Sequence, residues 1–408
     1  MSHCTTSAVC GVPERAVLAP RNSLWPAAFF ALGTFAIGTE GFMIAPLLPR
    51  MAVDFGMSVS AVASLVVVFT LVLAFSSPIS TVLTGRVNRK DVLLLAMGVF
   101  TLANVLAAKS SSFGGLLAAR IMMAVAAGLY VPNANALAGT LVAPERRGRA
   151  LAIVSGGMTI AIALGLPLGA LVGHSFGWRA TFLAVAVMGM VACVGIVFGV
   201  KRPAGGQAQT AGLAERLSVI RQPKLRRLLL VTLFWSMGAY TTYPYIAPYL
   251  SHVLSFGERG IGWSVSWWGV FAALGVLNGG ALNDRFGSQV VARTSLVLLA
   301  FAFWLLAAAA AAGMSLSAAL VPVLAAIAVW GFSVWSFFPA QMARLMAAGT
   351  ADQTPVALSL NTSTMYFGFS IGSALGAIIL GTGAIWGIGL AAGVFAMLAF
   401  LMDRRVGV

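Results

Sequence analysis

The chain has 408 residues, of which 60% are hydrophobic and only 9% are Asp, Glu, Lys or Arg. Soluble domains carry about a quarter charged residues, so this composition and a mean hydropathy of +0.96 exclude a soluble globular protein and indicate a membrane protein. The formal charge of +15 comes from short basic clusters between apolar runs, which is a topology signal, so no nucleic-acid partner is expected.

Twelve apolar runs of about 20 residues follow one another, each long enough to cross a bilayer as a helix. They cover approximately residues 24–47, 60–82, 91–108, 114–141, 150–172, 180–200, 228–250, 262–282, 294–312, 318–343, 355–382 and 384–402. No alternating ten-residue segments appear, which favours helices over a barrel. The first 23 residues lack an apolar region of their own, so no cleaved signal peptide is expected.

Basic residues fix the expected orientation of these spans. With both termini in the cytoplasm, the outer loops carry only Arg50, Lys109, Arg179 and Arg259, and nearly all other Lys and Arg face inside. The expected organisation is a cytoplasmic tail (1–23), a six-helix bundle (24–200), a cytoplasmic linker (201–227), a second six-helix bundle (228–402) and a short tail (403–408). The protein is expected in a bacterial inner membrane.

Span 1 contains a carboxylate, Glu40, and span 4 contains a guanidinium, Arg120. Span 1 runs outward and span 4 runs inward, which puts both groups roughly 9 Å below the outer surface, at the same depth. Ionisable groups inside a membrane face a cavity or a partner, because exposure to lipid is costly. Burial favours a neutral acid and a nearby guanidinium favours a carboxylate, so conformation can switch the acid. We expect Glu40 to bind a transported proton and Arg120 to modulate it; a permanent salt bridge between spans 1 and 4 is the alternative.

The two halves of the chain resemble each other. The segment TVLTGRVNRK, residues 81–90, and the segment GALNDRFGSQ, residues 280–289, each join the second and third spans of a half, 199 residues apart. The same offset relates Pro49 to Pro248 at the outer ends of spans 1 and 7. Duplication of this period is typical of transporters that rock two bundles around a central site. It predicts an all-α integral membrane protein with 12 transmembrane helices in two pseudo-symmetric six-helix bundles.

With these motifs the chain resembles the major facilitator superfamily over roughly residues 25–402, and within it the twelve-span drug:proton antiporter branch that includes arabinose efflux permease-like exporters. The family's loop motif, G-x-L-x-D-R-x-G-R-K, is kept in the second half at Gly280, Leu282, Asp284, Arg285 and Gly287. The first half keeps Leu83, Arg86, Arg89 and Lys90, but Gly85 stands at the acidic position and Asn88 at the later glycine. The resemblance implies a cytoplasmic gate; short basic turns obeying the charge bias are the alternative.

Glycines recur every four residues in spans 5 and 11, and they strip one helix face of side chains so that another backbone can approach. They are Gly165, Gly169 and Gly173 in span 5, with Pro167 beside them, and Gly368, Gly372 and Gly376 in span 11. The span-5 pattern resembles the family's antiporter motif, which implies export by antiport. Static close packing is the other interpretation.

Polar and aromatic residues near mid-span are candidates for a substrate cavity, and packing or interfacial positions are the alternative for each. They are Tyr130, Asn133, Asn135, Trp235, Tyr240, Tyr243, Tyr245, Asn278, Trp330, Trp335, Gln341, Asn361 and Tyr366. An aromatic cavity with few fixed charges suits amphipathic or lipophilic cationic compounds.

These features predict a secondary transporter that exports a small organic solute, drug-like or a sugar, by proton antiport with alternating access. An importer of a sugar or metabolite is the alternative. The three histidines fall in the tail or outer loops, and no HExxH or nucleotide-binding motif is present, so an enzyme is not expected. The protein is expected to be a monomer that interacts with a small-molecule substrate, protons and the lipid bilayer. No cofactor and no metal are expected.

Overall fold

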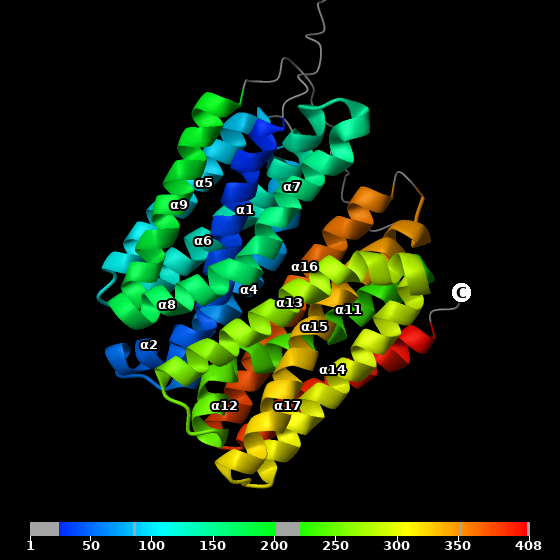
Figure 1. Ribbon diagram of the computed structural model, residues 1–408. Coiled ribbons are helices and arrows are strands. Elements are labelled where there is room, and N and C mark those ends of the chain that lie inside the picture. The colour runs from blue at the N-terminus through cyan, green and yellow to red at the C-terminus, as the bar shows by residue number, and fades with distance from the viewer. Residues whose placement is uncertain (1–23, 85–86, 201–220, 351–352, 406–408) are drawn as a thin grey trace, which may run out of the picture.

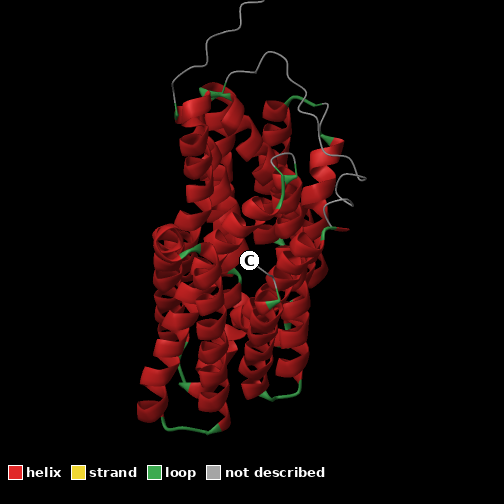
Figure 2. Ribbon diagram, turned by 90° about the vertical axis from the view of Figure 1, so that its right-hand side faces the viewer, coloured by secondary structure: helices red, strands yellow, loops and turns green. Residues whose placement is uncertain are grey.

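The computed structural model describes residues 24–84, 87–200, 221–350 and 353–405. Within these ranges every regular element is helical (Figure 2). The first half contains α1 (Trp25–Met43), α2 (Leu48–Phe55), α3 (Val59–Val62), α4 (Ser64–Leu83), α5 (Arg89–Lys109), α6 (Phe113–Thr140), α7 (Arg147–Ile160), α8 (Leu166–Phe176) and α9 (Trp178–Gly199). The second half contains α11 (Pro223–Thr242), α12 (Ile246–Val253), α13 (Glu258–Phe286), α14 (Ser288–Ala311), α15 (Leu316–Ala348), α16 (Thr354–Gly381) and α17 (Ile385–Arg404).

Three of the described spans are broken beside proline, which has no N–H to donate to the helix. Span 1 consists of α1, the 3-10 turn η1 (Ala45–Leu47) and α2. Span 7 repeats this break with α11, η4 (Tyr243–Tyr245) and α12. Span 5 consists of α7, the π-helical turn η3 (Ala161–Gly165) and α8. The related breaks in spans 1 and 7 agree with the duplication predicted from the sequence.

Eleven described segments are long and apolar enough to cross a membrane. The span that contains α11 is the exception, because its first turns carry Lys224, Arg226 and Arg227 and its last turns are rich in Thr and Tyr. Counting it, the chain has the twelve expected spans. α11 begins at Pro223, inside the range expected to be linker, and α17 runs to Arg404, inside the expected tail.

The glycine stripes lie at helix contacts within each half. A methyl group at Gly165, Gly169 or Gly173 would overlap Thr39, Met43 or Leu47 respectively, one above another on span 1. In the second half, Gly368, Gly372 and Gly376 face the corresponding positions of α11 and η4, including Ser236, Met237 and Tyr245. Span 5 is thus packed against span 1, the span that carries Glu40. Span 11 is packed in the same way against span 7, which corresponds to span 1 in the second half.

Figure 1 shows the two bundles side by side, α1 to α9 in one and α11 to α17 in the other. α4 packs against α16, and α8 with η3 packs against α13. Further contacts join α2 and η1 to α12, at the end of the molecule that we call the closed end. The bundles diverge toward the opposite end (Figure 1). By the charge bias of the loops, the closed end is the one expected to face outside.

Candidate functional site

Glu40 of α1 and Arg120 of α6 form an ion pair, and neither side chain is exposed. The Arg120 guanidinium also lies 4.1 Å from the centre of the Phe69 ring on α4. Apart from each other, the charged atoms of the two residues have no hydrogen-bond partner in the described part of the chain. Burying two charges with so little further hydrogen bonding is unfavourable for stability, so stability alone does not account for this pair.

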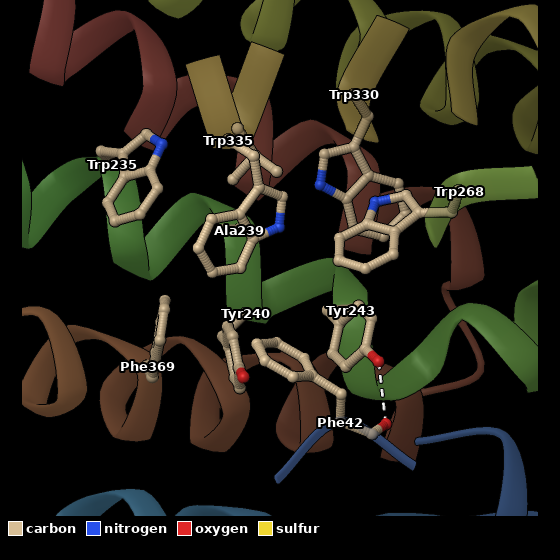
Figure 3. A pocket seen from close by; sticks show the side chains of 10 residues that line it. Phe42, Trp235, Ala239, Tyr240, Tyr243, Trp268, Trp330, Trp335 and Phe369 are labelled. Carbon is tan, nitrogen blue, oxygen red and sulfur yellow. Dashed lines mark hydrogen bonds between the residues drawn. The ribbon is translucent and has the colours of Figure 1, made fainter. Parts of the chain in front are cut away.

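An aromatic cavity lies close to this pair, and all but one of its lining residues belong to the second half. Phe42, two residues after Glu40, is the exception. The others are Trp235, Ala239 and Tyr240 of α11, Tyr243 of η4, Trp268 of α13, Trp330, Val334 and Trp335 of α15 and Phe369 of α16 (Figure 3). Arg120 and Tyr240 are near enough to interact electrostatically. Tyr240 therefore connects the ion pair to the cavity.

Ring contacts hold the aromatic side chains of the cavity in place. Tyr240 stacks on Phe369 with ring centres 3.7 Å apart, and Tyr243 contacts Trp268 at 4.8 Å. The Tyr243 hydroxyl donates a 2.8 Å hydrogen bond to the Phe42 carbonyl, which is available because the helix ends there, before Pro46 (Figure 3). This bond joins the two halves at the cavity.

Of the candidate cavity residues, the structure brings together five: Trp235, Tyr240, Tyr243, Trp330 and Trp335. Tyr130 instead donates a hydrogen bond to the Phe30 carbonyl inside the first half, and Tyr245 to the Ser373 carbonyl inside the second. Asn133, Asn135 and Asn278 donate to backbone carbonyls of their own helices, and Tyr366 contacts Phe369 edge to face behind the cavity wall. Phe42, Trp268 and Phe369 line the cavity without having been expected there.

Gln341 and Asn361 belong to a buried polar network of the second half. The Gln341 side chain donates to the Thr232 hydroxyl at 3.0 Å, and that hydroxyl donates to the Asn361 side-chain oxygen at 2.6 Å. Arg344 donates to Gln341 and pairs with Asp403 of α17, which is completely buried.

Asp403, which was expected in the short C-terminal tail, lies in the last turn of α17 and is completely buried. α17 continues to Arg404, and two arginines enclose the Asp403 carboxylate: Arg344, and Arg293, whose Nε lies 2.8 Å from Oδ2. This cluster ties together α14, α15 and α17. Asp403 follows the last apolar residues of the span, so the hydropathy of the sequence does not indicate that it is buried.

The two loop motifs differ in their contacts. Lys90 donates to the carbonyls of Val197 and Val200 and so caps the C-terminus of α9, while Arg89 lies in the first turn of α5. Leu83 ends α4, and Arg86 lies outside the described residues. In the second half Gly280 lies on α13, and Gly287, with a φ of 82°, makes the turn into α14.

Asp284 and Arg285 are exposed, and neither makes an ion pair with a described residue. A gate role for them remains a prediction about another arrangement of the halves.

The chain is similar to known proteins in sequence and in structure. The model of the Major Facilitator Superfamily matches residues 30–257. The chain is 27% identical over 390 residues to the inner membrane transport protein YdhP of Escherichia coli (strain K12), which covers 93% of this chain and 96% of that protein. It is 30% identical over 276 residues to the chloramphenicol resistance protein of Streptomyces lividans, covering 67% of this chain and 70% of that one.

The fold recurs in a crystal structure of a bacterial homologue of the human lysosomal transporter Spinster, in an inward-facing and unoccupied conformation. The TM-score is 0.73 at 17% identity, over 93% of this chain and 96% of that chain. The expected fold of twelve spans in two six-helix bundles is confirmed. The family match also confirms the expectation of a transporter and not an enzyme.

Proposed function

The chain belongs to the Major Facilitator Superfamily, and we propose that it exports a small organic solute in exchange for protons. One observation carries this proposal. A fully buried pair, Glu40 and Arg120, lies beside an aromatic cavity that both halves line. The ion pair, as the proton site, and the cavity, as the solute site, are therefore adjacent. A movement of one half against the other alters the surroundings of both sites.

Proton coupling follows from the chemistry of the pair. While Arg120 lies against Glu40, the carboxylate form is favoured; when the arginine withdraws, burial favours the protonated acid. The two groups lie on different helices, α1 and α6, and Arg120 also contacts Phe69 of α4. A shift among these helices therefore makes Glu40 bind or release a proton.

Coupling to the solute follows from Phe42 and Tyr240. Phe42 is on the same helix as Glu40, and Tyr240 lines the cavity and interacts electrostatically with Arg120. A solute held against these two residues favours the arrangement in which Arg120 pairs with the Glu40 carboxylate, the form that has lost its proton. This contact is the route by which solute and proton compete.

Export and an inner-membrane location have weaker support. The glycine stripe of span 5 resembles an antiporter motif and packs along the helix of Glu40. Relatives include a chloramphenicol resistance protein and an inner membrane transport protein. With basic loops inside, the diverging end of the bundles faces the cytoplasm, where an exporter loads its solute.

Everted membrane vesicles with an acidic interior test this function. Chloramphenicol, tetraphenylphosphonium and arabinose, each radiolabelled, form the panel. We expect wild-type protein to accumulate at least one of them uphill and Glu40→Gln to lose this accumulation. Glu40→Gln should still exchange labelled for unlabelled solute, which shows that it folds and binds.

Glu145→Gln makes the same change at an exposed position and should behave as wild type. Uphill accumulation by Glu40→Gln would contradict the proposal. Uptake driven by an acidic exterior in right-side-out vesicles would indicate an importer instead.

A further inference from the structure

Four tryptophans line the aromatic cavity, and no described residue accepts a hydrogen bond from their indole N–H groups. Trp235 and Trp330 are 1% exposed, Trp268 is 4% exposed and Trp335 is 9% exposed. None of the four Nε1 atoms has a hydrogen-bond partner in the described part of the chain. In Figure 3 the nitrogens of Trp330 and Trp335 point into the space between their two rings.

No group of the cavity accepts from these donors. Its other side chains are hydrocarbon except for the phenols of Tyr240 and Tyr243, and neither hydroxyl accepts a hydrogen bond from an indole N–H in the described part of the chain. The volume open to water is about 10 Å³, which is room for about one molecule. Ring faces accept N–H groups only weakly. Because buried donors without acceptors are costly, such a cluster needs a reason other than packing.

We propose that the cavity binds uncharged aromatic solutes that carry hydrogen-bond acceptors, such as carbonyl or nitro oxygens. An indole N–H only donates, so the four tryptophans select a ligand that accepts. This inference rests on the proposed function, because it names the class of solute that the transporter carries.

The charges around the cavity favour neither cationic nor anionic solutes. Among the described residues no charged side chain lines the cavity, and the neighbouring charges of Glu40 and Arg120 neutralise each other. A buried ion would therefore lack a counter-charge. A cation would also meet the positive ends of the indole N–H groups. The aromatic lining alone would suit a cation, but these donors favour a neutral acceptor.

Phe42 controls the space that a solute needs. It is the one lining residue from the first half, and the hydrogen bond from Tyr243 holds its carbonyl. When the halves separate at this contact, Phe42 moves away from the four tryptophans. The cavity then enlarges on the side that faces α1, while the donors keep their places on the second half.

Binding of two matched neutral probes to the purified full-length protein tests the inference. Benzophenone and diphenylmethane have the same two rings, but only benzophenone has a carbonyl acceptor. We expect benzophenone to bind about tenfold more tightly, which corresponds to one or two net hydrogen bonds. Tetraphenylphosphonium, a cation without an acceptor, should bind more weakly than benzophenone.

Replacing the donors tests which groups cause the preference. Trp330→Phe and Trp335→Phe, singly and together, keep a ring but remove the N–H. In the double variant the ratio of the benzophenone affinity to the diphenylmethane affinity should fall toward one. Because the two probes have the same two rings, a change in cavity volume affects both affinities and cancels in the ratio. Trp267→Phe is the matched control, because the Trp267 N–H donates to the Leu324 carbonyl outside the cavity.

Three results would overturn the inference: equal affinities in wild type, a ratio that survives in the double variant, or tighter binding of tetraphenylphosphonium. The assay uses no pH gradient, so its outcome is independent of coupling. Equal affinities alongside uphill export would reject the solute class and leave the function intact. The expected ratio without any uphill transport would reject the function and leave the binding site.

Discussion

The Nε atom of Arg50 lies 2.6 Å from Oε1 of Glu258, and this ion pair joins α2 of one half to α13 of the other. The second carboxylate oxygen of Glu258 lies 2.7 Å from Nδ1 of His174 on α8. Arg50 also donates to the carbonyls of Gly173 and His174, which fixes its position on the first half. One carboxylate from the second half is thus held by two groups of the first, at the closed end of the molecule.

Removing this carboxylate should loosen the closed end. We expect Glu258→Gln to shift the population toward the separated arrangement by up to about fivefold, a modest change because the side chains are 40% and 47% exposed. Spin labels at Val53 of α2 and His252 of α12, in a protein without its native cysteines, report the distance between the halves.

Asp54→Asn is the control for this measurement. Asp54 pairs with Arg179 and Trp178 within the first half at the same end, so its loss should leave the distances unchanged. Identical distance distributions in all three proteins would show that the Glu258 contact does not hold the halves.

The contact between spans 1 and 5 should be sensitive to a single methyl group. Gly165→Ala places a methyl against Thr39, the neighbour of Glu40. We expect a loss of about 1–3 kcal/mol in the free energy of unfolding, the usual range for overpacking, together with slower transport. Denaturant unfolding in detergent and vesicle uptake measure the two effects.

Gly156→Ala is the matched change on the same span. A methyl there meets nothing within 4 Å, and alanine favours a helix, so stability should be unchanged or slightly higher. If both variants were equally stable, the glycine stripe would have no packing role.

The buried Asp403 cluster should stabilise the second half. Asp403→Asn leaves Arg344, 8% exposed, without its carboxylate, and weakens the hold on Arg293. We expect a loss of about 3 kcal/mol, the scale for breaking a buried pair. Thermal unfolding checks this, with exposed Asp284→Asn as the control. A melting temperature equal to that of the control would refute a structural role for the cluster.

The sequence predicts the fold well because twelve long apolar runs and a charge bias determine spans and orientation without knowledge of contacts. It also brings Glu40 and Arg120 to one depth, and the structure pairs them. It does not identify Phe42, Trp268 or Phe369 as cavity residues. An apolar ring in a membrane helix can face lipid or a cavity, and only the rotation of the helix distinguishes the two.

The sequence also fails to show which polar residues of a span face the cavity, because it does not determine the rotation of the helix. Gln341 and Asn361 are uncommon in membrane spans and were expected at the substrate, but both turn inward to bonds within the second half. The apolar run predicts that Asp403 lies in the tail because hydropathy does not mark the last turn of α17, which ends at Arg404. Position along a span is readable from sequence, whereas the direction of a side chain around it is not.

Proton release on solute binding tests the central claim most directly. The purified protein is kept in weakly buffered detergent solution with a pH indicator, at a pH low enough to protonate Glu40 and separate it from Arg120 in the absence of solute. Chloramphenicol, or whichever compound of the vesicle panel is exported, is then added. The account predicts release of about one proton per wild-type chain and none from Glu40→Gln, although both bind the solute. Equal release from both proteins would contradict the assignment of the exchanged proton to Glu40.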